Sequence, residues 1–283
     1  MIKKLLFAAC IALSTGSYSA TVYDTLYLNR DTVEMGSMLV NRCVFNDDMT
    51  FDKQNANIQL DVGDVLELTI YNIDTVSHDV AVANGNALGT IAAGANSSYS
   101  IPFNDFGTFG VKATDTRGDL LGAFAVIRVG LIGEISFVWN LWDINDTLSL
   151  DIGTGVQSSI PIDYRPNVYT INSEVYPQTS TEPLGAVSAN VGDTIYVSIV
   201  NSGNMVHTLH YHGFHFEFLQ VAQRTHVTNW IKDSAPMFID ETTTIRFVPD
   251  KPGMYPVHDH NLISVLTENT YPGGMITTLN IQP

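Results

Sequence analysis

His207-Thr-Leu-His-Tyr-His-Gly-Phe-His-Phe216 carries four of the eight histidines of this chain, and Tyr255-Pro-Val-His-Asp-His260 adds two more. Residues two positions apart on a β-strand point to the same face of the sheet. Two same-face pairs result: His210 with His212, and His258 with His260. Neutral imidazole is a ligand for copper, zinc, iron and nickel. If the two strands are neighbours, the four histidines form a metal site; the alternative is that they are polar residues of a β-surface.

The rest of the chain around these blocks predicts β-structure. Short alternating or β-branched runs such as Val65–Tyr71, Thr108–Ala113 and Thr194–Val200 are separated by Gly, Asn, Asp and Pro. Regularly spaced short strands with turn residues between them are typical of sandwiches and barrels. We therefore predict an all-β protein with little helix.

An internal repeat predicts the number of domains. A pattern of Val-Gly-Asp, then Asn, then His occurs twice, with every member 129 residues apart: Val62-Gly-Asp64, Asn72 and His78, then Val191-Gly-Asp193, Asn201 and His207. Such a repeat indicates two copies of one β-domain in tandem. The expected division is a first domain over residues 21–135, a connector over 136–164 and a second domain over 165–283.

The N-terminus reads as a secretory signal peptide over residues 1–20. Lys3-Lys4 precede the apolar run Leu5–Leu13, and mostly small residues follow up to Ala20, which predicts cleavage near Ser19 or Ala20. The run is too short to cross a bilayer and no later run is long enough, so membrane insertion is not expected. The mature protein is expected to be secreted, either periplasmic or extracellular.

Net charge and cysteine content exclude some classes of partner and an internal disulfide. The formal net charge is −16 with only 13 Lys and Arg residues, which argues against binding to nucleic acid or anionic membranes. Cys10 leaves with the signal peptide, so Cys43 is the single cysteine of the mature chain and no internal disulfide is expected. We interpret Cys43 as a small buried hydrophobic residue.

The His-x-x-His-x-His-Gly block, the later His-x-His and a distant Gly-Met resemble the last domain of a multicopper oxidase. This resemblance implies two tandem cupredoxin-like Greek-key β-sandwiches. In the family, the position of His207 binds the type 1 (blue) copper, and Met275 resembles its axial ligand. The remaining matches are to ligands of the trinuclear copper cluster: His210, His212, His258 and His260.

The chain departs from the family pattern at the blue copper site. Asp259 stands where the family has its cysteine, and Asn261–Tyr271 contains no second histidine. A carboxylate cannot make the short thiolate bond that blue copper needs. We therefore expect His207, Asp259 and Met275 to form a vestigial type 1 pocket without a blue centre.

The first domain has lost more of the family's ligands. By the repeat, His78 corresponds to His207, and we interpret it as a hydrogen-bonded core or rim residue. Lys112, Ala113 and Thr114 stand where His-Cys-His would be. The chain thus supplies four of the eight cluster histidines.

Three functions stay open at this level. The first is a secreted copper-binding protein with oxidoreductase activity at a non-blue histidine site; the second is a non-catalytic copper carrier. The third is a degenerate cupredoxin tandem that serves as a structural or surface-interaction protein. Copper is the expected metal, with zinc as the alternative. In two-domain members of the family the cluster forms between chains of a trimer, so a homotrimer is the expected oligomer, although here metal cannot join its subunits in that way.

Overall fold

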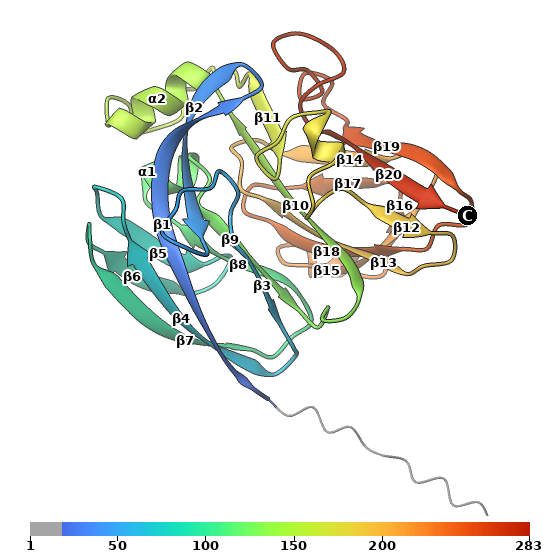
Figure 1. Cartoon of the computed structure of the whole chain (residues 1–283), viewed down its shortest axis with the longest axis horizontal. Coiled ribbons are helices and arrows are strands. Elements are labelled where there is room, and N and C mark those ends of the chain that lie inside the picture. The colour runs from blue at the N-terminus through green and yellow to red at the C-terminus, as the bar shows by residue number, and fades with distance from the viewer. Residues whose placement is uncertain (1–18) are drawn as a thin grey trace, which may run out of the picture.

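Two β-sandwiches lie side by side in the computed structural model, which describes residues 19–283 (Figure 1). All but the last two residues of the expected signal peptide lie outside the described part. The first strand, β1 (Thr21–Met35), begins directly after the predicted cleavage position. Within residues 19–283, no helix is long and apolar enough to cross a membrane.

The first sandwich packs a four-stranded sheet, in the order β2-β1-β4-β7, against a five-stranded sheet, in the order β3-β9-β8-β5-β6. Its elements after β1 are β2 (Met38–Asn46), β3 (Asn57–Leu60), β4 (Asp64–Asn72), β5 (His78–Val82), β6 (Ala87–Ile91), β7 (Asn96–Phe103), β8 (Gly107–Ala113), helix α1 (Thr116–Leu120) and β9 (Phe124–Val129).

The second sandwich packs a six-stranded sheet, in the order β11-β10-β13-β18-β15-β16, against a five-stranded sheet, in the order β12-β20-β19-β14-β17. Its elements are β10 (Ile135–Ile144), helix α2 (Asp146–Thr154), β11 (Val168–Ile171), the 3-10 turn η1 (Gln178–Ser180), β12 (Ser188–Asn190), β13 (Ile195–Asn201), β14 (His207–Tyr211), β15 (Phe216–Val221), the 3-10 turn η2 (Thr225–Val227), β16 (Ile231–Lys232), β17 (Ser234–Met237), β18 (Thr242–Phe247), β19 (Gly253–Asp259) and β20 (Ile276–Gln282).

The two sandwiches repeat one topology. In the first, β1 pairs in parallel with β4 and antiparallel with β2; in the second, β10 pairs in parallel with β13 and antiparallel with β11. The other sheets agree as well, because β9-β8-β5-β6 and β20-β19-β14-β17 have the same order and the same antiparallel pairing. The all-β class and the tandem arrangement predicted from the sequence are therefore confirmed.

All of β10 except its first residue, Ile135, lies in the segment that we expected to be a connector, residues 136–164. Its pairing with β13 over Ile135–Leu141 makes it a strand of the second sandwich, in the place that β1 has in the first. Helix α2 follows it and packs on β2 of the first sandwich, where Ser149 Oγ accepts a hydrogen bond from the Asn41 N–H, 3.0 Å away. We propose that the second domain starts at β10 and that α2 with the loop after it is an insertion between β10 and β11.

Side-chain alternation places the two cores. In β4, Leu66, Leu68 and Ile70 are buried, whereas the residues between them are partly exposed, as a strand with one face on the core requires. Each sandwich has its own apolar cluster, and a small third cluster around Phe124, Val138 and Val200 lies between them. β14 and β19, which carry His207, His210 and His258 and directly precede His212 and His260, are neighbours in the second sandwich.

Candidate metal centre

The four same-face histidines meet at the ends of β14 and β19. The two strands are antiparallel, and their register sets His210 directly opposite His258, with ring centroids 5.8 Å apart. The His212 ring lies 5.0 Å from that of His210 and 5.2 Å from that of His258, and the His260 ring lies 5.7 Å from that of His210. We call these four residues the histidine quartet. The alternation that places two residues per strand on one face therefore brings the four imidazoles together.

Hydrogen bonds orient two of the quartet rings. His210 Nδ1 lies 3.2 Å from the Asp233 carbonyl oxygen and 3.1 Å from Ser234 Oγ, and His258 Nδ1 lies 2.9 Å from the Asp259 carbonyl oxygen. A ring nitrogen that faces a carbonyl oxygen carries the proton, which leaves the lone pair on Nε2. Such outer partners fix the tautomer and the direction of histidine ligands in metal sites.

The spacing within the quartet is uneven. His212 Nε2 and His258 Nε2 are 3.1 Å apart, and two nitrogens at about 2.0–2.1 Å from a shared ion would subtend about 100° at this separation. Within residues 19–283, the one group of three metal-type donors that all lie within 4.8 Å of one another is Cys43, Asp74 and His78. The quartet is wider than this, so a bound ion would draw the rings of His210 and His260 inward.

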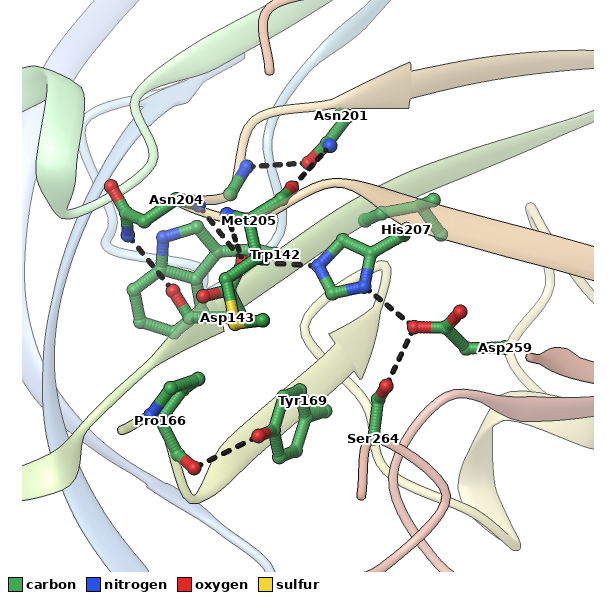
Figure 2. A network of polar contacts seen from close by, with 12 residues as sticks. Trp142, Asp143, Pro166, Tyr169, Asn201, Asn204, Met205, His207, Asp259 and Ser264 are labelled. Atoms are coloured by element: carbon green, nitrogen blue, oxygen red, sulfur yellow. Dashed lines mark hydrogen bonds and ion pairs between the residues drawn. The ribbon is translucent and has the colours of Figure 1, made fainter. Parts of the chain in front are cut away.

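The inner face of the same strands holds a buried ionic network (Figure 2). His207 Nδ1 lies 2.7 Å from Asp259 Oδ2, and His207 Nε2 lies 3.0 Å from Asp143 Oδ1 at the end of β10. Ser264 Oγ and the Thr208 N–H also donate to the Asp259 carboxylate, over 2.6 and 2.9 Å. The Asp259 side chain thus points away from the quartet and toward His207, on the face that alternation assigns to it.

The hydrogen bonds in this network favour the charged forms of His207 and Asp259. Burial alone would lower the pKa of His207, but hydrogen bonds to Asp143 and Asp259 outweigh it and raise the pKa to about 9. Burial would raise the pKa of Asp259, but its contact with His207 outweighs that effect and holds the pKa below the usual range. At neutral pH His207 is therefore an imidazolium between two carboxylates.

A blue copper ion does not fit this pocket. Both ring nitrogens of His207 are occupied by carboxylates, and no thiol faces them. Met275 is fully buried in the second core, and its carbonyl oxygen accepts the Asp259 N–H over 3.1 Å. Because blue copper requires a thiolate and two imidazoles, this donor set cannot form the centre.

The Cys43, Asp74 and His78 group in the first sandwich does not fit a metal either. Arg30 binds both carboxylate oxygens of Asp74, over 2.8 and 2.9 Å, and both ring nitrogens of His78 face carboxylates. Burial raises the pKa of the Cys43 thiol, which keeps it protonated. Metal binding by cysteine requires the thiolate. Cys43 is therefore a buried thiol in an apolar core, as we interpreted it from the sequence.

Comparison with known proteins relates part of the chain to a known family. Residues 156–271 match the family model described as multicopper oxidase. A search of curated proteins gives no match. The resemblance to the multicopper oxidase family, seen first in the histidine blocks, is confirmed.

Several solved structures share the fold over both sandwiches. The blue copper oxidase of Nitrosomonas europaea superposes with a TM-score of 0.77 at 17% identity, covering 93% of this chain and 86% of its own. The multicopper oxidase mgLAC gives a TM-score of 0.75 at 14% identity, with 93% and 86% coverage. The copper nitrite reductase of Nitrosomonas europaea gives 0.70 at 14% identity, with 93% and 94% coverage. At these identities the likeness establishes the cupredoxin fold.

Sequence reasoning missed one carboxylate at His207 and both carboxylates at His78. Asp143 lies 64 residues before His207 on a strand that we had placed in the connector, and no motif joins the two. In the first sandwich, Asp74 and Asp115 contact His78. An Asp four residues before His78 was the one local signal available.

Proposed function

We propose that the protein binds about one copper ion per chain through His210, His212, His258 and His260, at a site without a thiolate. The observation that carries this proposal is the meeting of four imidazoles from two paired strands, with His210 and His258 in direct register. The alternative, unrelated polar residues on a β-surface, does not account for two rings held by carbonyl oxygens in the tautomer that frees Nε2.

Copper is preferred to zinc on two grounds. An all-imidazole donor set binds Cu(II) more tightly than Zn(II) in the general affinity order of divalent metals. In addition, the solved structures of the same fold include a blue copper oxidase and a copper nitrite reductase, and nothing in the comparisons favours zinc.

Bound copper would supply one-electron redox chemistry at a solvent-facing site. The chain itself orients the rings through the Asp233 and Asp259 carbonyl oxygens and Ser234 Oγ. Asp259 replaces the cysteine that in the family would link a blue centre to the cluster, so no electron relay leads inward from the quartet. We propose oxidoreductase activity that depends on direct contact between reductant and site; the alternative is a copper carrier without turnover.

Metal analysis with electron paramagnetic resonance tests the site. Wild-type protein loaded with Cu(II) should hold about one ion per chain, with nitrogen couplings and without the intense blue absorption of a thiolate. The double variant His210→Ala/His258→Ala should lose stoichiometric copper. The matched control is His215→Ala/His226→Ala, which removes two histidines outside the quartet. Full copper retention in the first variant would refute the site.

Oxygen consumption separates the two functions that share this site. Copper-loaded wild-type protein is mixed with a one-electron reductant under air, and the rate is compared with that of the His210→Ala/His258→Ala variant at equal total copper. A rate that depends on the quartet supports oxidoreductase activity. Equal rates in the two proteins would leave copper carriage as the function.

We further propose that the mature protein is secreted and forms a homotrimer through apolar contacts. Secretion rests on the signal-like segment Lys3–Ala20 and on the start of β1 immediately after it. The first-domain position that corresponds to His258 holds Lys112, whose Nζ lies 2.6 Å from both Asp119 and Asp240. A neighbouring chain would therefore meet an ion-paired ammonium at that position and no metal ligand.

A further inference from the structure

The two buried histidines related by the sequence repeat have the same surroundings. His78 and His207 are each completely buried, and each ring nitrogen of both residues faces a carboxylate oxygen. The other six histidines of the chain are partly or fully exposed. The resemblance assigns His207 to the position of a blue copper ligand, and the repeat assigns His78 to the same position in the first domain. Because the two histidines have the same surroundings, one cause should explain both.

On the Nε2 side of His78, the carboxylate comes from the loop after β4. Asp74 Oδ2 lies 3.0 Å from His78 Nε2, and Asp74 Oδ1 accepts the Thr75 N–H over 2.6 Å. Arg30 completes the shell of this carboxylate from β1.

In the second sandwich, the repeat position of Asp74 is Gly203, and the carboxylate is supplied from elsewhere. Asp143 at the end of β10 lies 3.0 Å from His207 Nε2 and accepts the Asn204 N–H over 2.8 Å. They correspond to the bonds that Asp74 makes with His78 and with the Thr75 N–H. A Cβ at Gly203 would lie 2.4 Å from Asp143 Oδ1, so the missing side chain makes the space that Asp143 fills. Figure 2 shows Asp143 facing His207 from β10.

The Nδ1 side also uses carboxylates that the repeat does not relate. His207 Nδ1 faces Asp259 on β19, whereas the first-domain counterpart of Asp259 is Ala113. There Asp115, two residues further along, turns back to lie 2.9 Å from His78 Nδ1 while it caps helix α1. Neither carboxylate of one cluster corresponds in sequence to a carboxylate of the other.

We propose that each domain has replaced the metal at its type 1 position by a histidine cation clamped between two carboxylates, and that both pockets are closed to metal ions. The same geometry reached through four carboxylates at unrelated positions indicates that the arrangement itself is required. In the first sandwich the cation joins β5 to the loop after β4 and to the loop before α1. In the second sandwich it joins β14 to β10 and to β19.

Charge balance agrees with this proposal. A buried carboxylate is tolerated only with a partner charge and satisfied hydrogen bonds. Burial would lower the pKa of His78, but its bonds to Asp115 and Asp74 outweigh that effect and raise the pKa to about 9, as for His207. To bind either imidazole, a copper ion would have to displace a proton and a hydrogen-bonded carboxylate. Neither pocket offers a thiolate ligand that would compensate for this loss.

Nuclear magnetic resonance of the metal-free wild-type protein, labelled with ¹⁵N histidine, tests the charge state without any variant. Two imidazole rings should show protons on both nitrogens at neutral pH, with slow exchange against solvent because His78 and His207 alone are fully buried. Two slowly exchanging rings with one unprotonated nitrogen each would overturn the proposal.

A carboxylate transfer tests the equivalence of Asp74 and Asp143. Gly203→Asp alone adds a third carboxylate to the cluster, in contact with Asp143. Asp143→Ala alone leaves His207 with Asp259 as its single carboxylate. Each single variant should lower the melting temperature by about 5–10 °C. The double variant moves the carboxylate to the place it has in the first domain and should melt above both single variants. A double variant that melts below both would contradict the equivalence.

Metal exclusion is measured in the His210→Ala/His258→Ala background, so that failure of the proposed quartet cannot be mistaken for failure of this inference. Cu(II), Co(II) and Zn(II) should each bind at well below one ion per chain, and His207→Gln in that background should change nothing. A stoichiometric ion that disappears with His207→Gln would show that the pocket is open.

Discussion

His212 Nε2 and His258 Nε2 face each other across 3.1 Å at the solvent end of the β14–β19 pair. In the metal-free protein one ring must donate to the other, because two lone pairs at this distance repel. Burial and the neighbouring His210 and His258 lower the pKa of His212, which keeps its ring neutral and able to act as a ligand.

His212→Ala should weaken copper binding by at least about tenfold, since loss of even an outer partner of a metal ligand costs about 10–100-fold. Affinity is measured by competition with a chromophoric chelator. His215→Ala is the control, because His215 is an exposed histidine three residues from His212 and is not a member of the quartet. Equal affinities for the two variants would exclude His212 from the site.

Asp259→Cys should not create a blue protein, although it restores the thiolate at the family's position. The new thiol would face His207, but Asn261–Tyr271 offers no second imidazole, and Asp143 holds His207 Nε2. Loss of the buried carboxylate should lower the free energy of unfolding by about 3–5 kcal/mol. The visible spectrum of the copper-loaded variant checks this, and a stable intense blue band would show that another histidine, His215 or His226 first, reaches the pocket.

Raising the pH from 6 toward 9 should destabilise the protein through His78. Its pKa is raised from 6.5 to about 9 in the folded state, so its contribution is fully present below 6.5 and is lost as the pH rises through about 9. The shift corresponds to about 3 kcal/mol. Urea unfolding across this range measures the loss.

Asp115→Asn should flatten the pH dependence, because it removes one of the two carboxylates that stabilise the His78 cation. The exposed Asp105→Asn substitution serves as its control. Identical pH profiles for Asp115→Asn and wild type would argue against a charged His78.

Chelation should leave the oligomeric state unchanged. In the first domain, Lys112, Ala113 and Thr114 offer no ligand to the quartet of a neighbouring chain, and Lys112 is already paired with Asp119 and Asp240. Light scattering before and after treatment with a strong chelator measures this. Dissociation of a native trimer into monomers on chelation would mean that metal bridges the subunits.

Export should leave a mature chain that begins close to Thr21. β1 pairs with β4 from Thr21 onward, so cleavage near Ser19 or Ala20 leaves this strand pairing whole. Mass spectrometry of the protein recovered from the periplasm or medium locates the cleavage. An intact Lys3-Lys4 segment on the exported protein would contradict the signal peptide.

Sequence reasoning was strongest where a local period reports on structure. The i, i+2 spacing of His210 and His212 carried enough information to place their side chains on one face, and the 129-residue repeat predicted two sandwiches. It failed at β10, because Val138–Ile144 is buried on both faces and shows no alternation. Asp143 was missed for a related reason, since its contact with His207 depends on how two distant strands pack and not on any spacing along the chain.

β10 also decides how independent the two halves are. Trp139 and Leu141 are part of the second core, whereas Trp142 and Ile144, on the same strand, are part of the first. Cutting the chain before Ile135 would remove the Trp142 indole, which packs 4.2 Å from the Arg42 guanidinium, from the core of the first sandwich. The other fragment would carry this indole without the residues that cover it. Neither half can therefore be expressed as a soluble module by division at that point, and a loss of order in one core should spread along this strand to the other.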